Sequence, residues 1–362
     1  MTVYNLARRR ILKCVSGLSR FGTKSLPGLE VHNLSLFKRK NATLTPTQKG
    51  PWSVLFFGSD EFALDSLRAL HNQYRLQKLL CRLEVVTAYK GKENCLTKYA
   101  KENGITVHQW PVNVNNLDFH IGVVVSFGHL IPSHIINSFP LGIINVHASL
   151  LPRWRGSAPI IYALMNGDTE TGISLMKIKP KRFDVGEVIA QEKTTVGPEE
   201  TQPELYTKLA RMGSKLLIKT VEKLPDVLCC GIPQSEESVT YAPKITADIS
   251  FVKWNEMTAK NVFDLNRALT GLYPLRTNFK EQAVKLSDIR IFSDIPDVIS
   301  SGDIEAGTVI YNKESDSLLV KCKENTWISI KKIRIPGKPQ MPALDFRNGF
   351  MGGQKLKSCN FY

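Results

Sequence analysis

The sequence predicts an α/β protein with a doubly wound, mostly parallel sheet, followed by a small C-terminal β-barrel domain. The mostly apolar runs WSVLFF at 52–57 and GVVVS at 122–126 are typical of parallel strands that are buried on both faces. Segments with helical spacing of apolar residues alternate with these strands, as in a sheet built from strand–helix–strand units. From residue 241 onward, short alternating strands separated by turns indicate a small barrel.

The first part of the chain contains the elements of the expected Rossmann-like sheet. Strands are expected at 52–57, 83–87, 107–110, 122–126, from Ile143, 172–178 and 188–191, and helices at 61–70, 95–103, 133–138, 158–166 and 204–224. The turn after the first strand has a single glycine, Gly58, and lacks the three-glycine fingerprint GxGxxG. A nicotinamide dinucleotide is therefore not expected.

The chain has 362 residues and a formal net charge of +15, and much of this charge is concentrated near its beginning. Residues 1–50 hold ten Lys and Arg against one acid, Glu30, so their net charge of +9 leaves +6 for the remainder. Basic residues among Leu, Ile, Val, Ser and Thr are typical of a mitochondrial transit peptide, and no apolar core of a secretory signal follows. We expect import into the mitochondrial matrix; the alternative is a disordered basic tail that contacts RNA.

Cysteine usage and hydropathy argue against a zinc protein, a disulfide-stabilised protein and a membrane-spanning protein. The chain has seven scattered cysteines without a CxxC pair, which indicates neither a zinc site nor a disulfide framework. No run of 18 apolar residues is present, so no membrane partner is expected.

The second part of the chain is expected to form a separate domain. We assign 51–224 to the catalytic domain, 225–240 to a linker rich in Pro, Gly, Ser and Glu, and 241–362 to a barrel that binds RNA. One helix is expected at 258–269, with Thr258 as its cap, and strands at 283–291, 307–311, 318–323 and 326–335. Lysines and arginines along the last strand, namely Lys331, Lys332 and Arg334, suit a nucleic-acid surface. The alternative is a solvated basic face.

The stretch 142–161, GIINVHASLLPRWRGSAPII, is the candidate site. Asn145 and His147 lie two residues apart in a predicted strand and therefore share a face. The strand ends in a loop containing Pro152 and Gly156, and open α/β sheets place their sites at such carboxyl ends. Taken alone, the Asn could cap a turn and the His could be a core residue.

These residues, with Asp184, resemble the formyltransferases that use 10-formyltetrahydrofolate. The resemblance covers residues 53–350, including SVLFFGSDEFA, VVVSFGHLIP, the central block, YAPKI at 241–245 and the segment 345–349. It implies that Asn145, His147 and Asp184 are catalytic. The amide would donate to the oxyanion, the imidazole would donate to it or accept the amine proton, and the carboxylate would orient the ring.

The resemblance also implies the substrates. Members that formylate methionyl-tRNA in mitochondria match best, which implies 10-formyltetrahydrofolate as co-substrate, methionyl-tRNA as partner, no metal and no stable protein partner. The folate would be held by the loop after the strand and by the end of the preceding strand, namely Ser149, Leu150, Leu151, Pro152, Phe127 and Gly128. Contacts with tRNA are expected from Lys90, Lys92, Arg153, Lys331, Lys332 and Arg334. The glutamate tail of the folate is an alternative partner for Arg153 and Arg155. For Arg155 a role in bracing the loop through backbone carbonyls is preferred.

Two segments depart from the family pattern. The basic loop that enters the acceptor stem in bacterial relatives is short here, at 88–97, and carries lysines where arginine would bind phosphate bidentately. The segment Lys179–Glu187 is one residue longer than usual.

Three other functions stay open. A formyltransferase that acts on glycinamide ribonucleotide or a nucleotide sugar would share the three catalytic residues without needing a basic barrel. A formyl-folate hydrolase would release formate without an acceptor. A catalytically silent RNA-binding protein is the third alternative.

Overall fold

The computed structural model describes residues 49–89, 91–114, 118–293, 304–351 and 358–362. The predicted targeting segment 1–50 lies almost entirely outside these residues, and so does Lys90. The described residues belong to one compact unit, Thr43–Tyr362. Within the described ranges, no helix combines the length and the apolar character that crossing a membrane requires.

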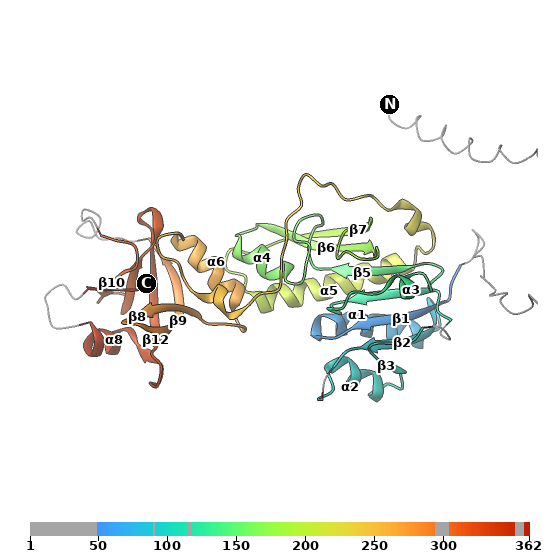
Figure 1. Ribbon diagram of the computed structural model, residues 1–362, viewed down its shortest axis with the longest axis horizontal. Coiled ribbons are helices and arrows are strands. Elements are labelled where there is room, and N and C mark those ends of the chain that lie inside the picture. Colours follow the sequence, from blue (N-terminus) through green and yellow to red (C-terminus); the bar gives the residue numbers. More distant parts are fainter. Residues whose placement is uncertain (1–48, 90, 115–117, 294–303, 352–357) are drawn as a thin grey trace, which may run out of the picture. The chain divides into compact units, whose positions relative to one another are not determined.

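A seven-stranded sheet forms the first part of the chain. Its strands are β1 (Trp52–Gly58), β2 (Leu80–Thr87), β3 (Val107–Gln109), β4 (Ile121–Val125), β5 (Ile143–His147), β6 (Glu170–Lys177) and β7 (Val188–Thr195). They lie in the order β3-β2-β1-β4-β5-β6-β7 (Figure 1). β1 to β5 pair in parallel, whereas β6 and β7 are antiparallel. The predicted doubly wound, mostly parallel sheet is confirmed. The strand order reverses between β1 and β4: β2 and β3 follow on one side of β1, and β4 to β7 follow on the other side.

The four consecutive apolar residues at 54–57 of β1 have a direct structural reason. Val54 and Phe56 join one buried cluster, while Leu55 and Phe57 join a second cluster on the opposite face. The first cluster contains residues of α1 (Glu61–Arg75), α2 (Cys95–Glu102), α4 (Pro159–Met165) and α5 (Gln202–Val221), and the second contains α3 (Ser133–Ile136). Both faces of β1 are therefore covered. If polar and apolar residues alternated along the strand, the polar ones would all be buried in one of the two cores.

Side-chain caps mark the beginning of α1 and of α5. The carboxylate of Asp60 accepts hydrogen bonds from the amides of Phe62 and Ala63 at the start of α1. Thr201 and Glu204 form a reciprocal capping box at the start of α5. Such caps satisfy amide groups that would have no partner in the first turn of a helix.

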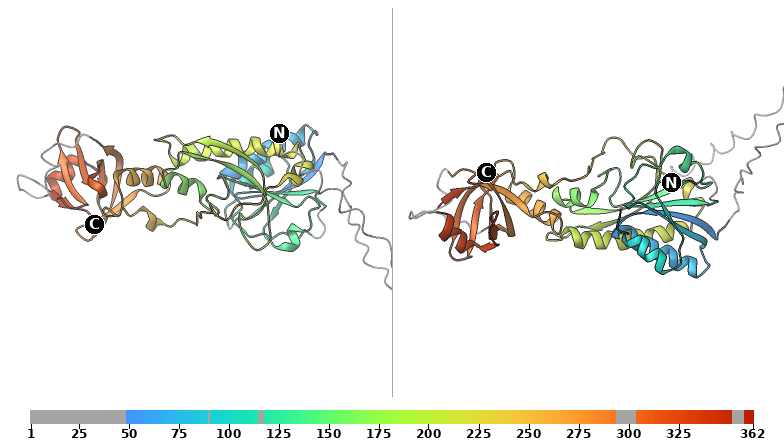
Figure 2. Two further views of the ribbon diagram at one scale, coloured as in Figure 1. Left: turned by 90° about the horizontal axis from the view of Figure 1, so that it is seen from above. Right: turned by 60° about the horizontal axis from the view of Figure 1, so that its bottom comes forward.

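The second part of the chain is a curled antiparallel sheet with two helices. Its elements are α6 (Ala259–Leu269), β8 (Leu275–Phe279), β9 (Gln282–Phe292), β10 (Thr308–Asn312), β11 (Ser317–Lys321), β12 (Trp327–Arg334), β13 (Met341–Pro342), α8 (Ala343–Phe350) and β14 (Ser358–Asn360). The order is β14-β10-β11-β12-β9-β8, with β13 on β12. Figure 2 shows this curled sheet, in orange and red, from two further sides. Asn278 of β8 and Tyr362, just after β14, exchange backbone hydrogen bonds of 2.9 and 3.0 Å and so link the two edge strands. The predicted small barrel is confirmed in this form, and Thr258 caps α6 as expected.

The segment between the two sheets is not a free linker. After a short 3-10 helix, η2 (Asp226–Cys230), it pairs with the first part of the chain at two places. Ile232 exchanges two backbone hydrogen bonds of 2.9 Å with Val188, and Ala242 donates one of 2.7 Å to the carbonyl of Arg155. We call residues 231–242 the strap. Its pairing brings it against the loop that follows β5.

Candidate active site

Three polar side chains meet at the carboxyl end of β5. Asn145 and His147 lie on this strand, and Asp184 lies in the connection from β6 to β7. The Oδ1 atom of Asp184 accepts a hydrogen bond of 3.3 Å from the amide of Asn145 and lies 3.6 Å from Nδ1 of His147. The imidazole and the carboxylate are 6% and 8% exposed. The structure thus brings together the three residues that the resemblance names as catalytic.

The hydrogen bond of His147 to the following loop determines which ring nitrogen can exchange a proton. Nε2 lies 2.9 Å from the carbonyl oxygen of Trp154. A carbonyl oxygen only accepts, so hydrogen-bonding logic assigns the proton of the neutral ring to Nε2. Nδ1, which faces Asp184, is therefore the atom that can take up or release a proton.

The position of Asp184 is set by its backbone as well as by its side chain. Its φ of +54° lies in the left-handed region, which Asp tolerates better than most residues. The Oδ2 atom accepts a hydrogen bond of 2.9 Å from the amide of Gly156. A Cβ at Gly186 would lie 1.6 Å from the carbonyl oxygen of Lys177, so only glycine fits beside this turn. The carboxylate is consequently held by two loops at once.

Gln234 of the strap is a site residue that sequence reasoning missed. Its side-chain amide donates hydrogen bonds of 2.9 and 2.8 Å to the carbonyl oxygens of Asp184 and Gly186. Its Oε1 accepts a bond of 2.9 Å from Nε of Arg155. The strap therefore joins the turn that carries Asp184 to the loop after β5. Nothing in the sequence signals this, because the contact spans 50 residues and involves backbone carbonyls.

The residues expected to hold the folate fall into two groups. Ser149 is fully buried and donates a hydrogen bond of 2.6 Å to the carbonyl of Arg153, and Leu151 is buried beside it. Ser174, also missed by the sequence, bonds to the carbonyl of Ser149 and to the amide of Leu151. These contacts define the shape of the loop. Leu150 and Pro152 are only partly buried, so their side chains can be reached from outside.

Phe127 and Gly128 follow β4. The ring of Phe127 is buried against those of Phe57, Trp110 and His129, at centroid distances of 5.6, 5.2 and 5.2 Å. Gly128 is exposed with a φ of +72°. Two surface hollows border α5, and Asn145, His147 and Asp184 line neither of them. The folate contacts stay a prediction.

The two arginines of the loop are both engaged within the protein. Arg153 forms a two-pronged ion pair with Asp168, at 2.8 and 2.5 Å, and lies over the ring of Trp154. The hydrogen bond to Asp168 raises the pKa of Arg153. Arg155 is buried, in keeping with the expected bracing role, but its partners are the side chains of Gln234 and Glu236 rather than backbone carbonyls.

The other residues expected to bind tRNA lie on the surface. Lys92 follows β2, and Lys331, Lys332 and Arg334 project from β12, all exposed. Lys332 forms an ion pair of 2.9 Å with Asp288. Within the described part of the chain, no group of His, Cys, Asp and Glu side chains is arranged to hold a metal ion.

Family models match most of the chain. A model described as formyl transferase matches residues 77–221, and one described as the C-terminal domain of formyl transferase matches residues 244–351. Among solved structures, the N-formyltransferase of Helicobacter canadensis in complex with folinic acid and dTDP-3-aminofucose has a TM-score of 0.58 at 18% identity, covering 77% of this chain and 98% of that chain. At this identity the likeness concerns the fold.

Curated relatives extend the match over nearly the whole described region. The mitochondrial methionyl-tRNA formyltransferase of Rattus norvegicus is 41% identical over 324 residues, which cover 87% of this chain and 83% of that protein. The mitochondrial protein of Homo sapiens is 41% identical over 311 residues, covering 84% and 79%. The methionyl-tRNA formyltransferase of Dictyoglomus thermophilum is 31% identical and covers 82% and 96%. The chain therefore belongs to the formyl transferase family, among the methionyl-tRNA formyltransferases.

Proposed function

We propose that this protein transfers a formyl group from 10-formyltetrahydrofolate to the α-amino group of methionyl-tRNA, for initiation of mitochondrial translation. The observation that carries the proposal is the convergence of Asn145, His147 and Asp184 at the carboxyl end of β5. It occurs in a chain that is 41% identical to mitochondrial methionyl-tRNA formyltransferases. Their names also support a mitochondrial location.

The reaction begins when the amine nitrogen attacks the formyl carbon, and negative charge develops on the formyl oxygen. Asn145 uses one amide hydrogen to bond Asp184, which leaves the second to donate to this oxyanion. Nδ1 of His147 accepts the proton that the amine loses. Breakage of the bond between the formyl carbon and the folate nitrogen then releases tetrahydrofolate, and its nitrogen takes up the proton held on Nδ1 of His147, which restores the neutral ring. Loss of one oxyanion donor costs roughly 100-fold or more in rate.

The substrates would be held on both sides of this trio. Leu150, Pro152 and Gly128 are accessible and would contact the folate, whereas Ser149 and Leu151 keep the loop in shape. Residues 51–224 would form the catalytic domain, 225–240 the linker and 241–362 the tRNA-binding domain, after a transit peptide at 1–50. The exposed cations of β12 would contact tRNA phosphates, a contribution that weakens with salt.

The acceptor distinguishes this function from its alternatives. The full chain is incubated with labelled 10-formyltetrahydrofolate and, in parallel, with methionyl-tRNA, free methionine, an amino-sugar nucleotide, glycinamide ribonucleotide or no acceptor. We expect a formylated product with methionyl-tRNA and with none of the other acceptors. Labelled formate released equally well without an acceptor would identify a hydrolase, and formylation of a small amine would identify another formyltransferase.

A further inference from the structure

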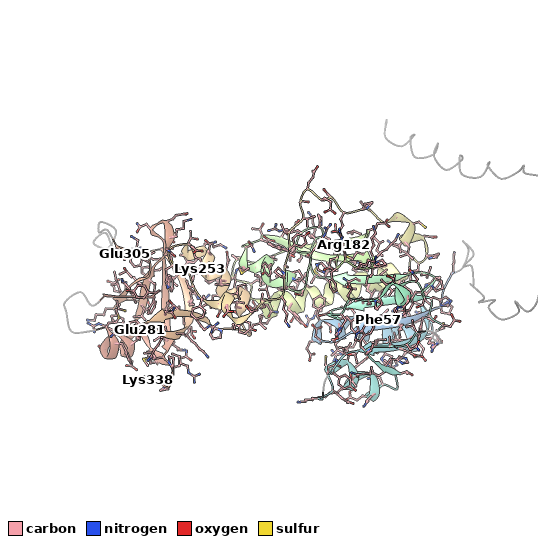
Figure 3. The ribbon with its side chains drawn as sticks, viewed as in Figure 1. Phe57, Arg182, Lys253, Glu281, Glu305 and Lys338 are labelled. Atoms are coloured by element: carbon pink, nitrogen blue, oxygen red, sulfur yellow. The ribbon has the colours of Figure 1, made fainter. Side chains whose placement is uncertain are left out.

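A basic loop lies directly before Asp184 in the connection between β6 and β7. We call residues 179–183 the basic loop; it contains Lys179, Lys181, Arg182 and Phe183. All four side chains are exposed, and the ring of Phe183 is 56% exposed. Figure 3 labels Arg182 in this connection. The next residue, Asp184, is buried, so the chain passes from open surface to the proposed catalytic trio within one step.

Two charges of this loop, those of Lys181 and Arg182, have no partner among the described residues, whereas Lys179 adds to the effect of Lys177 in lowering the pKa of Glu187. None of the described residues forms an ion pair or side-chain hydrogen bond with Lys181 or Arg182. Two other cations, one in the loop after β5 and one at the end of β6, are engaged: Arg153 with Asp168, at 2.5 Å, and Lys177 with Glu187, at 2.7 Å. Two positive charges beside the catalytic carboxylate are thus left for a partner.

The base of the loop is held in place. Lys181 and Asp184 both have left-handed backbone conformations, with φ of +71° and +54°. Gln234 binds the carbonyl oxygens of Asp184 and Gly186 and fixes the end of the turn. Two residues of extended chain span at most roughly 7 Å, so the Cα of Arg182 lies within that distance of the Cα of Asp184. The basic loop is therefore presented close to the place where the amine must react.

We propose that the basic loop binds the single-stranded 3′ end of the aminoacylated tRNA, with Lys181 and Arg182 on its phosphates and Phe183 stacked on a base. Exposed aromatic rings next to cations are what proteins use to bind single-stranded nucleic acid. A ligand with several carboxylates, such as a folate tail, would pair with Lys181 and Arg182, but it has no ring on which Phe183 could stack. The inference rests on the proposed function and adds a binding element to its site.

Removal of the two charges tests the phosphate contacts. In the variant K181Q/R182Q the side chains keep similar length but lose their charge, and their exposure leaves folding unaffected. We expect the KM for methionyl-tRNA to rise on the order of 10-fold at moderate salt. The slope of log KM against log salt should fall by about 1.4, since each phosphate contact on a single strand contributes about 0.7. The KM for the formyl donor should stay unchanged.

The matched control is R75Q/K78Q, which removes the same charge at the other end of the sheet. Arg75 ends α1 and Lys78 precedes β2, so both lie at the amino edge of the parallel strands. We expect wild-type kinetics. If K181Q/R182Q behaves like this control, the proposal is wrong. If only the KM for a polyglutamylated formyl donor rises, the loop binds the folate tail and the proposal is equally wrong.

Phe183 tests the stacking contact separately. Phe183→Ala should raise the KM for methionyl-tRNA about 5-fold to about 150-fold, whereas Phe183→Tyr, which keeps the ring, should stay close to wild type. Equal KM values for the two variants would contradict stacking. Wild-type enzyme is assayed first: failure to formylate methionyl-tRNA would refute the proposed function, whereas normal wild-type activity with unaffected variants would refute the basic loop alone.

Discussion

Gln234 offers the sharpest test of how the site is held together. Its amide donates to the carbonyl oxygens of Asp184 and Gly186 and accepts from the guanidinium of Arg155. Gln234→Ala removes all three hydrogen bonds, one of them to the backbone carbonyl of Asp184, and leaves the three catalytic side chains themselves unchanged. We expect a fully folded protein with a slower chemical step, because the turn that presents Asp184 loses its anchor.

The magnitude follows from burial. An intramolecular hydrogen bond contributes about 1 kcal/mol net, and a buried donor left without a partner costs about 1–3 kcal/mol. Arg155 is 4% exposed, but its second partner, Glu236, is 80% exposed and only weakly placed to replace Gln234. Gln234 itself is partly buried, so water can replace some of the lost bonds. The expected loss of unfolding free energy is about 1–3 kcal/mol. The expected loss of kcat is about 10-fold, the lower end of what is lost when a residue that orients a metal ligand is removed.

A second substitution separates stability from activity. Gln234→Glu keeps an acceptor for Arg155 but places a carboxylate oxygen against two carbonyl oxygens. Urea denaturation should therefore show a smaller loss for Gln234→Glu than for Gln234→Ala, while kcat should fall at least as far. Gln77→Ala is the control, since Gln77 also donates to a backbone carbonyl, that of Tyr74, but on the surface at the end of α1.

Steady-state formylation at saturating methionyl-tRNA and formyl donor gives the decisive readout. If Gln234→Glu retains kcat within about twofold of wild type, the strap does not position Asp184 and the reasoning fails. A fall in kcat proportional to the loss of stability in both variants would also contradict the reasoning. The lower kcat would then follow from the lower stability and not from the lost hydrogen bond to Asp184.

Three further outcomes are expected. Gly156→Ala should destabilise the protein by at least about 2 kcal/mol in urea denaturation, because φ is +125° and the new Cβ would lie 2.5 Å from the carbonyl oxygen of Ala242; stability equal to wild type would refute the close approach. Cys322, whose pKa burial raises to about 12, should react with iodoacetamide far more slowly at pH 8 than exposed Cys81, and equal labelling by mass spectrometry would contradict its burial. Burial raises the pKa of Asp60 above 3.8, so the native state binds the proton more tightly than the unfolded chain does. The free energy of unfolding of the wild type should therefore fall as pH rises through the raised pKa. Asp60→Asn lacks this pH dependence, so its stability relative to wild type should improve between pH 4 and pH 7.

The fold was largely predictable because its first sheet is buried on both faces. Every residue at 54–57 and 123–125 is apolar, since successive residues enter different cores. β8, β14 and α8 were not predicted. β14 is a strand because it pairs with β10, which lies about 50 residues earlier in the chain. α8 follows Pro342 and has no side-chain cap that would mark its beginning. Such elements depend on contacts distant in sequence, which local patterns do not carry.

The candidate site was predictable in part for a similar reason. Asn145 and His147 share a strand face, so their spacing alone placed them together. Asp184 entered only through the resemblance to a family, because its contact with His147 spans 37 positions. The pairing of Arg153 with Asp168 left no signal in the sequence, and it occupies a side chain that was expected on tRNA.

The central claim is that the trio at the end of β5 carries out the transfer. Its most direct test is the single-turnover rate of formylation of methionyl-tRNA by His147→Ala, measured with both substrates bound. The account predicts a rate at least about 100-fold below wild type, since the amine proton then has no positioned acceptor. An unchanged rate would show that His147 takes no part in the chemistry and that the site lies elsewhere.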